Sequence, residues 1–346
     1  MRYNKILLIL SLMIGCLSAT AMTADTVRKA KKGIIVVEYD STARAMEPYS
    51  FNRTALDYYA QVVNHYQETF PEVSVYAMVV PNAVAFYCPD SVVTWSSDEH
   101  AAIKYLNRQL DKNVYGIDLC PVLQPHADEP IYARTDHHWM PLGAYYAAQE
   151  FALVAKVPFL DLSEYDEHVI RNFVGTMYRF SGDRAIQAHP EDFVYYTPRD
   201  VKYEASHVRY SYHSRRVGKK RRRRTVTTLV AHPSERCDFF RPFPDGSAAA
   251  YSTFMGGDLN TTSVKTDTEN GRRLLILKDS YGNALPAFLF GSFQEIHVVD
   301  CRYFTQNIIS FVIEHDITDI LFANNLIHAS SPVTSQSYKK YLTQHR

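Results

Sequence analysis

The 346 residues of this chain are enough for one large α/β domain with an insertion, or for two smaller domains. Hydrophobic residues make up 46% of the chain, which is ordinary for a globular protein. Lys and Arg together number 37, as do Asp and Glu, so the balanced charge excludes a global attraction to nucleic acid. Partners must therefore be inferred from local features.

The N-terminus has the layout of a secretory signal. Two basic residues precede an apolar run over residues 6–17, which is too short to span a bilayer comfortably, and Ala-Thr-Ala follows at 19–21. We expect removal of residues 1–21 and export to the periplasm or the extracellular space. The sequence Met-Ile-Gly-Cys also resembles a lipoprotein cleavage box, so anchoring through a lipidated Cys16 is the alternative.

Four cysteines remain if Cys16 is removed with the signal. An oxidising compartment permits disulfides among them, but their wide spacing specifies no pairing and matches no zinc motif. We interpret them as structural and expect no disulfide that activity requires. They are Cys88, Cys120, Cys237 and Cys301.

Strand-like and helix-like segments alternate in the first half of the chain. Short apolar runs rich in β-branched residues predict strands, and apolar residues at helical spacing predict helices. Ser96 and Glu99 form a capping box before the second helix, and Pro141 stands at the first position of the third. The predicted strands are 33–39, 74–80 and 114–119, and the predicted helices are 53–70, 96–110 and 142–154.

The same alternation returns near the C-terminus. Parallel strands need a crossover connection, which is usually a helix, so this order predicts a doubly wound parallel sheet covered by helices on both faces. The late strands are predicted at 273–277, 296–299 and 320–323, and the late helices at 282–293 and 307–314.

The alternation fails in the middle of the chain, where Tyr-rich, Pro-punctuated sequence carries short β-like pieces at 192–196 and 225–230. We interpret this region as a β-rich insertion. The predicted organisation is a signal, a first part of the α/β domain, the insertion and a second part of the α/β domain. Their bounds are 1–21, 22–160, 161–270 and 271–346.

A strongly basic tract at 215–224 lies inside the predicted insertion. We interpret it as a solvated hairpin tip or an edge that contacts an anion or a glycan, and not as a nucleic-acid site, because single basic runs often match such motifs by chance. Replacing Arg221 to Arg224 by Ser is expected to leave folding intact.

Two short segments concentrate reactive side chains. The first, at 132–139, includes Asp136, His137 and His138 and precedes a predicted helix; the second, at 277–283, follows a predicted strand. In an open parallel sheet, ligands bind outside the carboxyl ends of the strands. The two segments could therefore share a cleft.

Ser280 lies where a strand ends and a helix is predicted to begin. A serine hydroxyl needs a base to remove its proton, and the base must be oriented by a carboxylate. His138 and Asp136 supply these groups, and the backbone N–H groups of the turn suit an oxyanion. Taken alone, Ser280 is more readily explained as a helix N-cap than as a nucleophile, because Ser is a favoured cap residue.

Other interpretations of the histidine pair stay open. Asp136, His137 and His138 could ligate a metal, although adjacent residues rarely aim at one ion and no further ligand stands at helical spacing. A structural, hydrogen-bonded histidine pair is the other alternative. We favour the triad, with no metal and no cofactor.

The two segments resemble motifs of a known family. Thr-Asp-His-His-Trp at 135–139, followed by Pro-Leu-Gly-Ala, resembles the signature of the DHHW family of exported bacterial proteins, and 278–283 with 299–304 resembles its second block. That family is similar to the alginate O-acetylation proteins, which have an SGNH-hydrolase-like fold. The resemblance implies that Asp136, His138 and Ser280 form the triad.

The chain departs from ordinary SGNH hydrolases in two respects. The Asp/His block precedes the Ser block, and Lys278 replaces the glycine of the usual Gly-Asp-Ser turn. The reversed order is harmless because a triad is defined by geometry. The missing glycine leaves the oxyanion residues unassigned. Candidates for binding substrate or the oxyanion are Trp139, Tyr281, Gly282, Asn283, Arg302 and Asn325.

These features predict an SGNH-like α/β enzyme that transfers or removes acetyl groups on a cell-envelope or extracellular glycan. The partners would be the acylated polysaccharide and a membrane-associated protein that delivers the acyl donor. The alternative is a non-catalytic glycan-binding protein that retains the fold, since fold does not imply activity.

Overall fold

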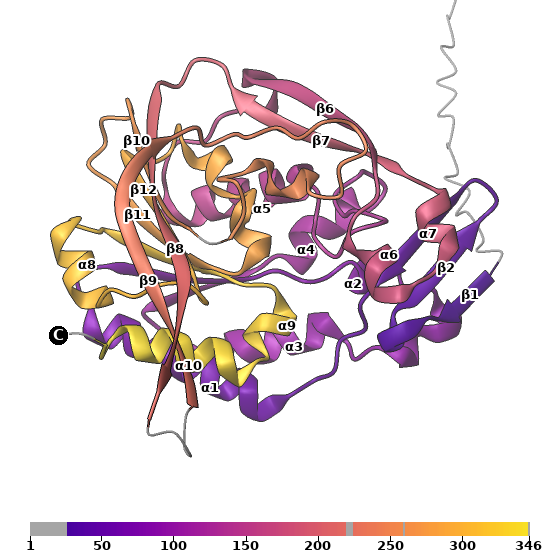
Figure 1. Cartoon of the computed structure of the whole chain (residues 1–346), viewed down its shortest axis with the longest axis horizontal. Helices are drawn as coiled ribbons and strands as arrows, with labels where there is room; N and C mark the ends of the chain where they lie inside the picture. The colour runs from indigo at the N-terminus through magenta and orange to yellow at the C-terminus, as the bar shows by residue number, and fades with distance from the viewer. Residues whose placement is uncertain (1–25, 219–223, 259, 345–346) are drawn as a thin grey trace, which may run out of the picture.

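The computed structural model describes residues 26–218, 224–258 and 260–344. Its centre is an eight-stranded sheet in the order β5-β4-β13-β11-β12-β10-β8-β9 (Figure 1). The first five strands of this order run parallel, and the last three are antiparallel to their neighbours. The parallel strands are β4 (Ser74–Val79), β5 (Val114–Asp118), β11 (Arg273–Lys278), β12 (Glu295–Asp300) and β13 (Asp319–Ala323).

The five parallel strands confirm the predictions made from short apolar runs. Successive side chains of a strand point to opposite faces of the sheet. In β11, Leu274 and Ile276 belong to one apolar cluster, whereas Leu275 and Leu277 belong to the other. Both faces of the sheet are therefore buried, as a doubly wound architecture requires.

Helices cover the two faces as predicted. The helices α1 (Arg53–Thr69), α3 (Glu99–Asn107), α8 (Ile308–Glu314) and α10 (Pro332–Tyr341) contribute to one cluster, and α5 (Pro141–Ala155) contributes to the other. Figure 1 shows α1, α3 and α10 together on one side of the sheet. The shorter helices are α2 (Val84–Tyr87), α4 (Cys120–Leu123), α6 (Thr176–Ser181), α7 (Arg184–Ala188) and α9 (Leu326–Ala329).

The strand predicted at 33–39 forms outside the central sheet. It is β2 (Ile35–Tyr39), which pairs antiparallel with β1 (Thr26–Lys29) and β3 (Thr42–Met46) in a separate three-stranded sheet. A short apolar run predicts a strand but does not identify its partners.

Two helix predictions need correction. The helix predicted at 282–293 is replaced by two 3₁₀ turns, η6 (Ser280–Asn283) and η7 (Pro286–Leu289), because Pro286 has no N–H for a continuing helix. The second helix is capped by Asp98, whose side chain accepts from the Ala101 N–H, and not by Ser96. The Ser96 hydroxyl instead accepts the Tyr49 N–H.

The region predicted as a β-rich insertion, 161–270, is rich in strands. Its strands β6 (Tyr165–Phe173) and β7 (Glu191–Pro198) pair only with each other, among the described residues. The strands β8 (Tyr203–Val217), β9 (Arg224–Cys237) and β10 (Asn260–Thr266) extend the central sheet. Part of the region is therefore continuous with the α/β core.

The basic tract at 215–224 lies at the end of the β8–β9 hairpin, where Val217 pairs with Arg224. Figure 1 shows this hairpin extending past the body of the molecule. Residues 219–223, and with them half of the tract, lie outside the described residues.

The predicted signal, residues 1–21, and Cys16 also lie outside the described residues. Within 26–218, 224–258 and 260–344, no helix is both long and apolar enough to cross a membrane. The four remaining cysteines are described, and each of them is a free thiol.

Candidate active site

The turn that carries Ser280 leaves the carboxyl end of β11. Its N-cap is Asp279, whose Oδ1 accepts the Tyr281 N–H at 2.9 Å. The other oxygen, Oδ2, accepts the Asn325 N–H at 2.8 Å and so joins the ends of β11 and β13. Because Asp279 does the capping, the hydroxyl of Ser280 is free for other contacts.

The loop that carries Asp136 and His138 lies immediately before α5. It folds back on itself through the Met140 N–H, which donates to the Ile131 carbonyl at 2.9 Å. Trp139 is fully buried, and its indole N–H donates to the Tyr281 carbonyl at 2.8 Å. This bond fastens the Asp/His loop to the Ser280 turn.

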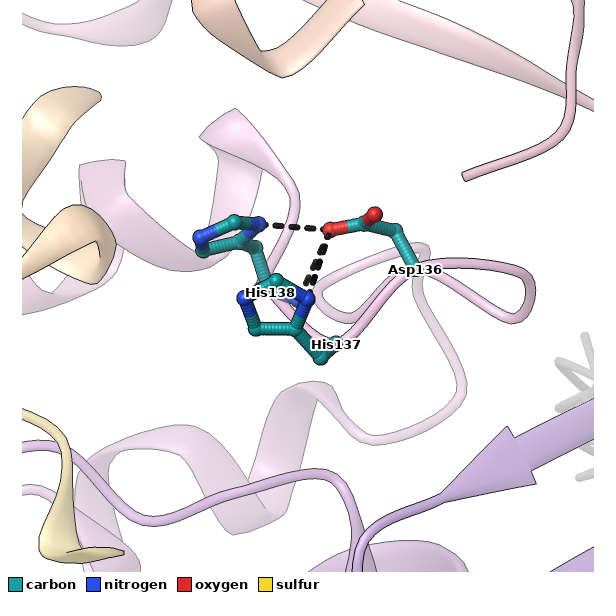
Figure 2. Close-up of side chains that lie close together, drawn as sticks. All are labelled: Asp136, His137 and His138. Atoms are coloured by element: carbon teal, nitrogen blue, oxygen red, sulfur yellow. Dashed lines mark hydrogen bonds and ion pairs between the residues drawn. The ribbon is translucent and has the colours of Figure 1, made fainter. Parts of the chain in front are cut away.

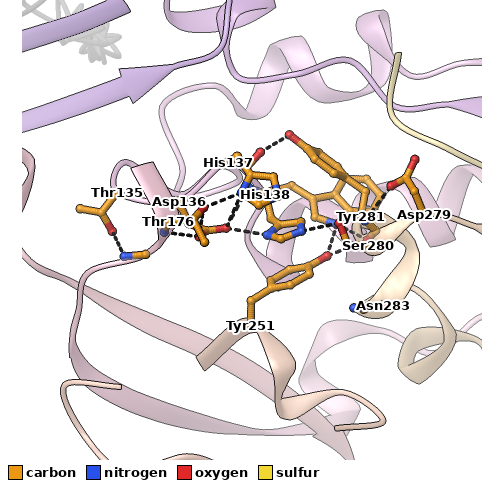
Figure 3. A network of polar contacts seen from close by, with 12 residues as sticks. Thr135, Asp136, His137, His138, Thr176, Tyr251, Asp279, Ser280, Tyr281 and Asn283 are labelled. Carbon is orange, nitrogen blue, oxygen red and sulfur yellow. Dashed lines mark hydrogen bonds and ion pairs between the residues drawn. The ribbon is translucent and has the colours of Figure 1, made fainter. Parts of the chain in front are cut away.

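The two segments meet in a continuous chain of hydrogen bonds (Figure 3). The Nε2 atom of His138 lies 2.8 Å from the Ser280 Oγ, and Nδ1 lies 2.5 Å from the Asp136 Oδ1. A carboxylate oxygen only accepts, so Nδ1 donates to it and Nε2 is left to accept from the serine hydroxyl. The structure thus brings Asp136, His138 and Ser280 together in the arrangement that an orienting carboxylate, a base and a nucleophile require, respectively.

The second oxygen of Asp136 is held by the start of α6. Oδ2 accepts the Thr176 N–H at 2.7 Å and its hydroxyl at 2.8 Å. Burial alone would raise the pKa of Asp136, but His138, with His137 and the Thr176 N–H, outweighs burial and holds the pKa well below its usual value. Asp136 is therefore a carboxylate.

Gly175 makes this contact possible, since a Cβ there would overlap the Asp136 side chain. Sequence reasoning missed both Gly175 and Thr176. They lie in the region without a regular pattern, and a Gly-Thr pair is too common to identify a partner of a distant carboxylate.

His137 lies beside the Asp136–His138 pair (Figure 2). Its Nδ1 is 2.6 Å from the Thr176 Oγ1 and 3.8 Å from the Asp136 Oδ1. Burial, reinforced by the proximity of His138, lowers the pKa of His137 to about 3, so the ring is neutral near pH 7.

Asp136, His137 and His138 bring three potential ligand atoms within 4.8 Å of one another, which is the arrangement that the metal interpretation needs. However, both oxygens of Asp136 and both ring nitrogens of His138 already have hydrogen-bond partners in the protein. A metal ion would have to displace these bonds. The hydrogen bonding therefore favours the triad.

Tyr251, in the 3₁₀ turn η5 (Ala250–Thr253), covers one face of the His138 ring. The two ring centroids are 3.9 Å apart and the planes differ by 8°. The Tyr251 hydroxyl donates to the Tyr281 carbonyl at 2.6 Å, which fixes the ring in this stacked position. The sequence carried no signal for this contact, because it depends on tertiary packing of the central region.

Three predicted oxyanion or substrate residues lie in the Ser280 turn. The Tyr281 hydroxyl donates to the His137 carbonyl. Gly282 is required by close packing, since a Cβ there would lie 2.5 Å from the Lys278 Cβ. The Asn283 Nδ2 donates to Asp258 at 2.8 Å, while its buried Oδ1 has no hydrogen-bond partner among the described residues.

The remaining candidates, Arg302 and Asn325, are engaged within the protein. Arg302 pairs with Asp300 at 2.6 Å and with Asp258 at 3.0 Å. The Asn325 Oδ1 accepts the His328 N–H at 2.9 Å and so caps α9. The only N–H of the Trp139 side chain likewise donates to groups within the protein. Arg302, Asn325 and Trp139 therefore help to hold the site together.

Lys278, which stands in place of the usual glycine, is buried, and its Nζ lies 2.9 Å from Asp300 and 3.8 Å from Asp258. Burial would raise the pKa of Asp258, but Lys278 and Arg302 lower it to about 2. The ionised Asp258 therefore links this charge cluster to Asn283.

Comparison with known proteins places the chain in a family. The family model described as DHHW protein matches residues 16–207, which is more than half of the chain. The crystal structure of a DHHW family protein from Eubacterium siraeum is 33% identical, with a TM-score of 0.79, and the alignment covers 93% of this chain and 100% of that one.

One more distant structure shares the fold. PatB1 from Bacillus cereus, solved with a sulfonyl adduct, is 18% identical with a TM-score of 0.65, over 87% of this chain and 97% of that chain. The O-acetyltransferase domain of AlgJ from Pseudomonas putida is 12% identical with a TM-score of 0.46, over 91% and 99%. No curated protein matched the sequence. The match to the family model and the 33% identity over nearly the whole chain establish that this protein belongs to the DHHW family.

Proposed function

We propose that the protein is a serine-dependent acyl-transfer enzyme that moves or removes acetyl groups on a cell-envelope or extracellular glycan. The observation that carries the proposal is the hydrogen-bonded chain from Asp136 through His138 to Ser280. The acetyl group and the glycan rest on the resemblance to the alginate O-acetylation proteins.

In the proposed reaction, His138 Nε2 takes the proton of Ser280 as Oγ attacks the ester carbonyl. The Asp136 carboxylate stabilises the imidazolium that forms. The imidazolium then gives its proton to the leaving alcohol, and an acyl-enzyme remains. Water or a sugar hydroxyl, deprotonated by His138, accepts the acyl group and releases Ser280. Esterase and transferase share this intermediate.

Two donors are suited to stabilise the tetrahedral oxyanion. Ser280 is the first residue of its turn, so its N–H has no acceptor within the turn. The Asn283 Nδ2 gives one hydrogen to Asp258 and has a second one to offer. We assign the oxyanion site to these two groups, with Asp258 as the residue that positions the amide.

A covalent serine probe tests the proposal. A sulfonyl fluoride should label wild-type protein at Ser280, which peptide mass spectrometry would locate, and Ser280→Ala should abolish the labelling. Ser247→Ala, in the loop before η5, is the matched control and should label normally. Absence of labelling in folded wild-type protein would instead favour a glycan-binding protein without catalysis.

A further inference from the structure

A second cluster of potential metal ligands lies at the start of β12. Lys278 and the triad lie near the other end of this strand, where Lys278 of β11 pairs with Asp300. Glu295 and His297 are two residues apart on this strand and therefore face the same side of the sheet, which α8 covers. His315 is the C-cap of α8. One potential ligand atom from each of the three residues lies within 4.8 Å of the other two.

One ring nitrogen of His297 is engaged by its neighbour on β10. His297 is 2% exposed, and its Nδ1 lies 2.9 Å from the Ser263 Oγ, directly across the strand pair. The buried Nε2 has no hydrogen-bond partner among the described residues. If Nδ1 donates to Ser263, Nε2 presents a bare lone pair to the cluster. A hydrogen bond from the second ring nitrogen is the usual device that orients a metal-binding histidine.

The carboxylate of Glu295 also has a neighbour that orients it. The Glu295 Oε1 lies 3.5 Å from the ammonium group of Lys265, which leaves Oε2 on the side of His297. The distance between His297 Nε2 and Glu295 Oε2 is 3.4 Å. Tetrahedral zinc with ligand bonds of about 2.0–2.1 Å separates two of its ligand atoms by about 3.3–3.4 Å. The pair is therefore spaced as two ligands of one zinc ion.

The ring of His315 completes the arrangement. Its centroid lies 4.3 Å from that of His297, with the planes tilted by 45°. Two imidazole nitrogens and one carboxylate oxygen suit zinc and its spectroscopic substitute cobalt, whereas magnesium and calcium prefer oxygen ligands alone. Lys265 is the one cation that contacts the cluster in the described part of the chain, and its side chain is 72% exposed and free to turn toward solvent.

We propose that Glu295, His297 and His315 form a zinc site, separate from the triad, that fastens the end of α8 to the central sheet. Three protein ligands leave a fourth position for water. Zinc bound there links β12 to α8, so it stabilises the folded state without taking part in acyl transfer.

The test uses the whole mature chain after treatment with a chelator. Wild-type protein should bind one equivalent of Co²⁺ with the visible absorption of tetrahedral cobalt, should compete with a chromophoric chelator for Zn²⁺, and should gain melting temperature when Zn²⁺ is added. His315→Ala and Glu295→Gln should lose all three responses. Ser263→Ala, which removes only the orienting hydrogen bond, should weaken zinc binding by about 10–100-fold.

His137→Ala is the matched control, because it removes a histidine from the other ligand cluster. It should bind zinc as wild type does. Melting temperatures without zinc establish that each variant folds. Absence of zinc binding by wild-type protein would overturn the proposal, as would binding that survives His315→Ala and Glu295→Gln but is lost in His137→Ala.

Discussion

Tyr251 shows what a stacked neighbour contributes to His138. The parallel contact at 3.9 Å restricts ring rotation and places an electron-rich face against the imidazolium that forms during the reaction. Tyr251→Leu removes the ring and should lower kcat by roughly 3–10-fold, since aromatic pairs contribute about 0.5–1.5 kcal/mol. Tyr251→Phe keeps the ring and should lie closer to wild type. Steady-state kinetics with a small acetyl ester measure both, and equal losses would show that the hydroxyl matters and the stack does not.

The triad side chains should act as one unit. Ser280→Ala, His138→Ala and Asp136→Asn are each expected to remove most hydrolysis of a small acetyl ester while the fold persists. The double variant Ser280→Ala/His138→Ala should be little worse than Ser280→Ala alone, because the function of each group depends on the other. His137→Ala should cost much less. Activity that survives Ser280→Ala but is lost with a chelator would exclude the triad and support a metal site.

The sequence predicted the three side chains that the structure brings together, but not those that hold them in place. Asp136, His138 and Ser280 follow from motif resemblance and from their positions before a helix and after a strand. Thr176 and Tyr251 contact them from the region between the two motifs, where no periodic pattern relates a residue to its neighbours in space. Arg302 and Asn325 were predicted near the correct edge of the sheet, but only packing reveals that Asp258 and α9 engage them.

Among the helices, the start of α3 shows how a local motif can mislead. Ser96 and Glu99 have the spacing of a capping box, yet Asp98 is the cap and Glu99 turns inward to Asn82. Asp98→Ala should lower the free energy of unfolding by about 1 kcal/mol, as loss of an N-cap does. Chemical denaturation measures the change. Asp40→Ala, at an exposed turn, is the control and should have little effect; equal effects of the two substitutions would contradict the assignment.

The long elements were predictable because burial on two faces gives strands a continuous apolar sequence. The parallel strands and α1, α5 and α8 all lie within a few residues of their predicted bounds. The pairing of strands was not predictable. The strand β2 is apolar and β-branched like the strands of the central sheet, but it joins a separate antiparallel sheet. The same holds for β8–β10, whose attachment to β12 depends on contacts far apart in the chain.

The stability of the whole molecule should depend on pH through Glu99. Burial raises the pKa of Glu99 to about 8, despite two hydrogen bonds from Asn82 that act in the opposite direction. The unfolded chain loses this proton near the ordinary glutamate pKa of about 4.3. The contribution to stability is therefore complete below about pH 4.3 and is lost as pH rises toward 8.

Melting temperatures between pH 5 and 8 test this dependence. Wild-type stability should fall across this range relative to Glu99→Gln, which cannot ionise and should give a flatter profile. The sign follows because the folded protein holds more protons than the unfolded chain in this window. Parallel profiles for the two proteins would show that Glu99 is ionised in the folded state.

His138 and Ser280 are 142 positions apart in the sequence, which makes the site sensitive to incomplete folding. Every segment that joins the two must be in place before base and nucleophile meet, and closing so long a loop is entropically unfavourable and slow until the sheet is assembled. Turnover is thus a reporter of the complete native topology. A fragment that ends before β11 lacks both Ser280 and the Tyr281 carbonyl that holds Trp139, so it should show no turnover.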